Sequence, residues 1–138
     1  MNSRTDIRYY AVGALVAQGL ACPERYLEML KEASPDRVID GLNPWMFLPN
    51  PERSVEYCAQ AAGQSVLPFA QAVGEDSVAC FVRLEAKEPG VVVINPWSED
   101  ASRVYRARLQ DFSAWLEYAE QVARSVSERE ADEEPDDD

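Results

Sequence analysis

Histidine is missing from this chain of 138 residues. Its absence removes the commonest general base, the Ser-His and Cys-His nucleophile pairs, and most zinc sites. The glycine-rich patterns that hold nucleotide phosphates, Gly-x-Gly-x-x-Gly and Gly-x-x-x-x-Gly-Lys-Ser/Thr, are missing as well. We therefore expect a protein that is not an enzyme and that has no cofactor, no metal site and no catalytic residues.

Cysteine is scarce, and its spacing does not fit metal or dithiol chemistry. Cys22, Cys58 and Cys80 are the three cysteines of the chain, and no two of them form a Cys-x-x-Cys pair. We interpret them as reduced thiols in a hydrophobic core. This interpretation favours a cytoplasmic protein, because a free cysteine packs there as a small hydrophobic residue.

The mostly apolar stretch 9–21 is well short of the ~20 residues that cross a bilayer, so we expect no transmembrane helix. A second interpretation is a lipoprotein-type export signal, because Arg4 and Arg8 lie at its start and it runs into Cys22. Asp6 and Gln18 interrupt that pattern, and a proline follows the cysteine directly. An amphipathic first helix fits the spacing better.

Basic residues are outnumbered, with 13 Lys and Arg against 25 Asp and Glu, which gives a formal charge of −12. The segment 127–138 has eight acids and one arginine and so supplies −7, which leaves −5 for the rest. This balance repels phosphate backbones and anionic lipids, so we expect neither nucleic-acid nor membrane binding. It attracts a basic protein, chiefly by raising the rate of encounter.

The hydrophobic pattern predicts a single domain at 1–126, followed by a solvated, mobile acidic tail at 127–138. Helices are predicted from near Asp6 to Pro23, from Pro23 to Ser34-Pro35, from Pro51 to a stop at Gly63, and along a stripe from Leu109 to Val122 or Ala123. Strands are predicted at 78–84 and 91–94 around a turn at Pro89-Gly90, with 104–105 as a third and 45–48 as a strand or a buried loop.

This order of elements predicts an α+β fold, a small and mostly antiparallel central sheet with helices packed on one side of it. The inward phases of the strand and helix patterns place Phe69, Phe81, Trp115 and Leu116 together in the core. The aromatic content is sufficient for a core without disulfides.

Six residues are candidates for a partner-binding surface: Trp45, Glu75, Asp76, Trp97, Glu99 and Asp100. The two tryptophans adjoin prolines in loop-like segments, where an aromatic ring either anchors a partner or caps the edge of the core. The acidic pairs adjoin predicted strands. Adjacent acids in turns are usually solvated surface residues, and two neighbouring carboxylates are too few for a calcium loop.

An ordered set of motifs resembles the SUKH superfamily, which includes the fungal Smi/Knr cell-wall regulators and many bacterial immunity proteins. Residues 22–30, Cys-Pro-Glu-Arg-Tyr-Leu-Glu-Met-Leu, are similar to the opening helix of that family. Leu-Pro-Phe-Ala at 67–70, Gly-Glu-Asp at 74–76 with the strand 77–82, Pro-Gly-Val-Val at 89–92 and Phe-Ser-Ala-Trp-Leu at 112–116 follow in the family's order.

The resemblance implies a SUKH-like α+β domain that has no known catalytic residues and serves as a protein-binding scaffold. It implies most directly an immunity protein that neutralises a cognate bacterial toxin, often a nuclease, by binding it. A basic toxin domain suits the acidic chain. The alternative is a cytoplasmic regulator or adaptor of the Smi/Knr type with no toxin partner.

Overall fold

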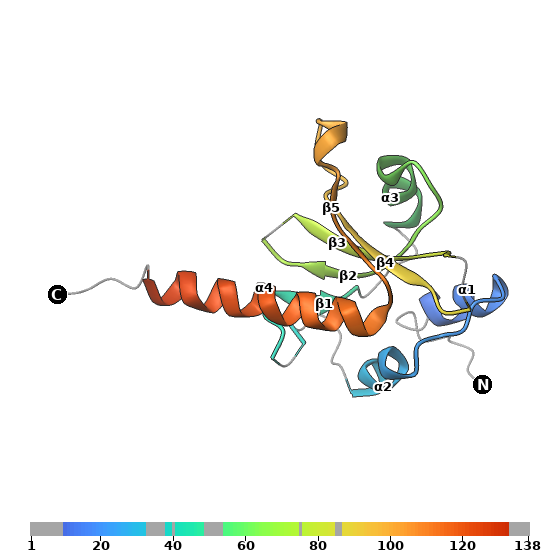
Figure 1. Ribbon diagram of the computed structural model, residues 1–138, viewed down its shortest axis with the longest axis horizontal. Helices are drawn as coiled ribbons and strands as arrows, with labels where there is room; N and C mark the ends of the chain where they lie inside the picture. The colour runs from blue at the N-terminus through green and yellow to red at the C-terminus, as the bar shows by residue number, and fades with distance from the viewer. Residues whose placement is uncertain are drawn as a thin grey trace.

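A computed structural model describes residues 10–32, 38–39, 41–48, 54–74, 76–84 and 87–132. In chain order the elements are α1 (Tyr10–Ala17), α2 (Glu24–Glu32), β1 (Trp45–Phe47), α3 (Val55–Ala62), β2 (Leu67–Ala72), β3 (Ser77–Val82), β4 (Gly90–Ile94), a 3-10 turn (Ala101–Arg103), β5 (Tyr105–Leu109) and α4 (Phe112–Asp132). The predicted α+β class is confirmed (Figure 1).

The described strands form one five-stranded sheet in the order β1-β2-β3-β4-β5, and each neighbouring pair is antiparallel. The predicted hairpin around Pro89-Gly90 is confirmed, since Phe81 lies opposite Val91 and Val78 opposite Ile94. This meander places the β2–β3 turn and the long β4–β5 connection at the same end of the sheet.

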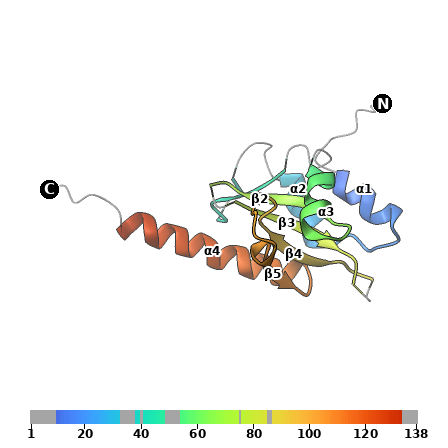
Figure 2. The same cartoon turned by 90° about the horizontal axis from the view of Figure 1, so that it is seen from above.

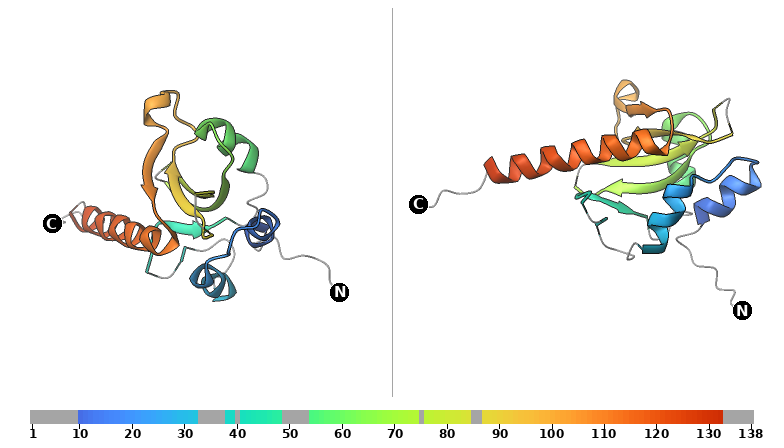
Figure 3. Two further views of the ribbon diagram at one scale, coloured as in Figure 1. Left: turned by 45° about the vertical axis from the view of Figure 1, so that its right-hand side comes forward. Right: turned by 60° about the horizontal axis from the view of Figure 1, so that its bottom comes forward.

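Helices cover both faces of the sheet, so the prediction of helices on one side is wrong. Alternate residues of β3 point to opposite faces. Ala79 and Phe81 join a cluster with α1, α2 and α4, whereas Val78, Cys80 and Val82 join a second cluster with α3. Figure 3 shows α3 on the side of the sheet away from α2. Every residue of β3 and β4 is buried, and all but Ser77 are nonpolar, as in strands that are covered on both faces.

The first cluster is an aromatic core around Tyr26 of α2. The ring centre of Tyr26 lies 5.1 Å from that of Phe81 and 5.5 Å from that of Phe69. Trp115 of α4 lies edge-on to Phe69 at 5.0 Å. The predicted burial of Phe69, Phe81 and Trp115 together is confirmed, and Leu116 is half-buried against the same cluster. Burial raises the pKa of the Tyr26 hydroxyl far above its ordinary value, with Cys22 adding to the effect, so this ring stays neutral.

The ends of α3 and α4 follow from local residues. Gly63 ends α3 with a left-handed φ of 73° and donates its N–H to the Ala59 carbonyl. Asp111 begins α4 by accepting the Ala114 N–H on its carboxylate at 2.9 Å. Leu109 therefore belongs to β5, and its assignment to the last helix was wrong.

Helix α4 crosses the sheet with its first half and extends beyond it with its second (Figures 1 and 2). It continues to Asp132, past the predicted domain boundary at Ser127. Among the residues that the structure describes, no helix is both long and apolar enough to cross a bilayer.

Candidate protein-binding surface

Trp45 is not available to a partner, which corrects its place among the candidate residues. It begins β1, is only 1% exposed, and meets Trp115 edge-on with ring centres 5.4 Å apart. The flanking prolines predicted a strand or a buried loop, and pairing of Met46 with Gln71 makes the segment an edge strand whose tryptophan is buried in the core.

The other candidates divide between two segments. Glu75 lies outside the described residues. Asp76 is exposed in the β2–β3 turn with a φ of 55°. Trp97, Glu99 and Asp100 lie in the β4–β5 connection, residues 95–104, at the same end of the sheet. Figure 1 shows the connection standing apart from the end of β2.

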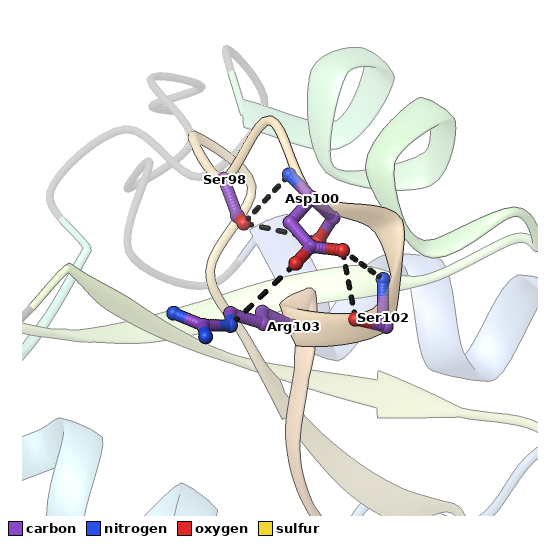
Figure 4. A network of polar contacts seen from close by, with 4 residues as sticks. All are labelled: Ser98, Asp100, Ser102 and Arg103. Atoms are coloured by element: carbon purple, nitrogen blue, oxygen red, sulfur yellow. Dashed lines mark hydrogen bonds and ion pairs between the residues drawn. The ribbon is translucent and has the colours of Figure 1, made fainter.

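Internal hydrogen bonds order the 95–104 connection. Asn95 donates its N–H to the Val104 carbonyl at 2.7 Å, which closes the base, and its side chain accepts the Trp97 N–H at 3.0 Å. The Asp100 carboxylate accepts the hydroxyl and the N–H of Ser102 at 2.7 and 3.0 Å and lies 3.5 Å from the Arg103 guanidinium (Figure 4).

These contacts give Asp100 a structural role. The Ser102 hydroxyl, and after it the Ser102 N–H, lower the pKa of the Asp100 carboxyl below its ordinary value, because both donate to the charged form. With Arg103 beside it, the Asp100 charge is partly satisfied within its own loop. Asp100 therefore shapes the connection more than it offers a free charge to a partner.

Trp97 contacts Tyr57, a residue outside the predicted candidate set. Its ring centre lies 6.1 Å from that of Tyr57 on α3, and the two side chains are 49% and 40% exposed. Glu56, next to Tyr57, and Glu99, two residues after Trp97, are also exposed. We call Glu56, Tyr57, Trp97 and Glu99 the aromatic–acidic surface.

The position of Tyr57 depends on how α3 is held. Cys58 turns into the second cluster, and at the end of the helix the Tyr105 hydroxyl of β5 donates to the Ala62 carbonyl at 2.7 Å. Gln64 donates to the same hydroxyl at 2.7 Å. These contacts join α3 to β5, the strand that follows the Trp97 loop. One signal in the sequence pointed to Tyr57: it is an aromatic residue on the polar phase of an otherwise alanine-rich helix.

A pocket is present beside α1. A cavity of about 240 Å³ lies between α1 and the start of β2, and its lining is apolar apart from Gln18, Gln64, Ser65 and Arg83. None of these is a carboxylate or a thiol. The described residues also contain no group of three or more cysteine, aspartate or glutamate side chains arranged to hold a metal ion.

Comparisons with family models, with curated proteins and with solved structures find no match for this chain. The fold and the aromatic–acidic surface are therefore the basis for assigning a class of function. They define a small α+β domain whose most distinctive exposed feature is a pair of aromatic rings flanked by carboxylates.

Proposed function

We propose that this chain is a non-catalytic protein-binding domain of the immunity type, which neutralises a basic toxin domain by binding it through the aromatic–acidic surface. The observation that carries the proposal is the exposed Tyr57–Trp97 ring pair beside Glu56 and Glu99. Exposed aromatic residues that rest on ordered neighbours are typical energetic anchors of protein interfaces, since little side-chain entropy is lost on binding.

The resemblance of the segments between 22 and 116 to the SUKH superfamily supports the immunity role. The net charge of −12 supports a basic partner, for which a nuclease domain is the leading candidate. The cytoplasm is the compartment that fits three cysteines without a disulfide. A Smi/Knr-type adaptor is the alternative, and gene neighbourhood separates the two: a toxin gene directly alongside favours immunity.

The experiment measures association and dissociation rates of this chain with the toxin domain encoded beside it. The paired reversal of Glu56 and Glu99 to Lys is expected to slow association about tenfold at low salt and to matter little at high salt, because screening acts on separated charges. Glu117 and Glu120 are exposed on α4, so their paired reversal to Lys is a control with the same change in net charge.

Trp97→Ala is expected to change the dissociation rate, raising it by at least about tenfold while leaving the association rate nearly unchanged. A partner that binds equally well to the Glu56/Glu99 reversal, the Glu117/Glu120 reversal and Trp97→Ala would exclude this surface. The absence of any binding to a neighbouring toxin domain would exclude the immunity role itself.

A further inference from the structure

The cavity beside α1, about 240 Å³ in volume, is lined by two kinds of residue. Its buried apolar residues, which we call the floor, are Leu15, Leu20, Val66, Leu67, Phe81 and Val82. Its exposed polar residues, which we call the rim, are Gln18, Gln64, Ser65 and Arg83. A site with an apolar interior and a few polar groups at its opening suits an amphipathic small molecule.

Backbone hydrogen bonds fix the segments that form the floor. Helix α1 ends at the cavity, where Gly19 turns the chain with a left-handed φ of 77°. Leu20 then donates its N–H to the Leu15 carbonyl at 2.9 Å, which brings both side chains to the floor. The sheet supplies the remaining part, where Leu67 of β2 is paired with Phe81 of β3. The cavity is therefore formed before a ligand binds, which lowers the cost of binding.

Arg83 is the charged residue among the described residues that line the cavity. Its guanidinium donates to the backbone carbonyl of Gln18 at the end of α1, and this contact holds the charge at the rim. A guanidinium has five N–H donors in a planar fork, so one such bond leaves donors for a carboxylate. None of the described lining residues is acidic, although the chain has a net charge of −12. The rim therefore favours an anion.

We propose that this cavity binds a small monocarboxylate with an aliphatic body, whose carboxylate pairs with Arg83 and whose carbon chain lies against the floor. An apolar cavity of about 150 Å³ holds benzene, so this one has room for about eight to ten non-hydrogen atoms. A dicarboxylate fits less well, because its second charge would be buried on the floor without a partner.

This inference does not rest on the proposed protein partner. The start of β2 and the end of β3 place the cavity at the end of the sheet that carries the β3–β4 hairpin. The 95–104 connection, with Trp97 and Glu99, is at the opposite end. A ligand in the cavity therefore leaves the aromatic–acidic surface uncovered.

The test titrates the full chain, labelled with nitrogen-15, with hexanoate, which has the size that the cavity allows. We expect saturable chemical-shift changes at the amides of floor residues such as Leu15, Leu20 and Phe81, with a dissociation constant of about 1 mM or lower. Hexanamide is the neutral ligand of matched size and should bind about tenfold more weakly, because it lacks the charge that strengthens the hydrogen bonds to the guanidinium.

Arg83→Gln is expected to weaken hexanoate binding about tenfold and to leave hexanamide binding unchanged, because the substitution removes the charge and keeps the floor. Arg124→Gln is the matched control. It makes the same change in net charge at an exposed residue of α4 that does not line this cavity, so hexanoate affinity should stay the same.

Hexanoate that causes no saturable change at the floor amides up to about 20 mM would overturn the site. Hexanamide that binds as tightly as hexanoate would overturn the assignment of a carboxylate ligand, and so would an Arg83→Gln variant with the parent's affinity for hexanoate. A variant that loses both ligands to the same extent would show that Arg83 maintains the shape of the cavity and does not bind the anion, which contradicts the proposal as well.

Discussion

Replacement of Trp115 by alanine tests the aromatic core most directly. The side chain is 0% exposed, and its ring centre lies 5.4 Å from that of Trp45, 5.0 Å from that of Phe69 and 5.4 Å from that of Phe112. Together with Phe112 and Ala119, it is a side chain through which α4 closes the first cluster. Truncation therefore removes three aromatic contacts at once and leaves a cavity between the helix and the sheet.

The expected size of the loss follows from two opposed effects. Truncation of a buried aromatic residue to alanine costs about 3–5 kcal/mol of unfolding free energy. Against this, the buried Nε1 of Trp115 has no hydrogen-bond partner among the described residues, and such a donor costs about 1–3 kcal/mol where it stands. We therefore expect a loss near the lower end of the range, about 3 kcal/mol.

Trp115→Phe separates the two effects. It keeps an aromatic ring in the cavity but removes the unpaired donor, so a loss of only about 1 kcal/mol is expected. Trp97→Ala, at an exposed tryptophan, should lose less than about 1 kcal/mol and controls for the change of residue type.

The assay is urea unfolding followed by far-ultraviolet circular dichroism at a fixed pH, with the slope of free energy against urea compared among the variants. A loss below about 1 kcal/mol for Trp115→Ala would show that this ring does not close the core. A Trp115→Phe variant as unstable as Trp115→Ala would refute the argument about the unpaired donor.

Three further predictions concern two glycines, the end of the chain and Asp100. Gly13→Ala should raise the unfolding free energy by about 0.5–1 kcal/mol, since an added Cβ meets nothing within 4 Å in α1. Gly90→Ala should lower it by about 1–2 kcal/mol, since its Cβ would lie 3.2 Å from the Leu109 carbonyl. Urea unfolding that shows the same change for both variants would contradict both predictions. Ending the chain at Ser127 should leave the melting temperature within a few degrees of the parent. The removed acids lie at the C-terminal end of α4, where negative charge is unfavourable to the helix dipole, so their loss should cost little stability. A truncated chain that fails to fold would overturn this prediction. The lowered pKa of Asp100 means that the contacts of its carboxylate stabilise the loop fully above the unfolded-state pKa and are lost as the pH falls through the folded-state pKa. An NMR titration should therefore place the midpoint of Asp100 below that of aspartate in an unfolded peptide. An equal midpoint would count against the Ser102 contacts.

The fold class and most elements could be predicted because the local signals agreed with the tertiary structure. Gly63 ends α3, the β-branched residues around Pro89-Gly90 form a hairpin, and the stripe from Phe112 onward forms α4. Strand β2 was not predicted, because Leu67–Ala72 has no β-branched residue and includes a proline. Pro68 is tolerated there because the register with β3 shifts between Pro68 and Ala70.

The candidate surface could be predicted only in part, because it joins segments that are distant in the sequence. Trp97 and Glu99 were identified from their loop, and their partners on α3 depend on the face that this helix covers. That choice is made by the second cluster, in which Cys58 meets the strand residues Val78 and Cys80. Trp45 was placed on the surface incorrectly, since its neighbouring prolines gave no sign that the β1–β2 register would turn its ring inward.

The distribution of charge indicates how a partner would be oriented. Although the chain is acidic, β5 has the exposed arginines Arg106 and Arg108, and Arg103 precedes it. Arg106 bonds the Ser77 hydroxyl at 3.0 Å and Arg108 stacks over the Tyr105 ring at 4.0 Å. Charged residues on an edge strand discourage pairing with other strands. If the proposed function is right, a basic partner would be repelled from the β5 edge and attracted by Glu56 and Glu99, and this asymmetry would turn it toward the Tyr57–Trp97 pair before contact is made.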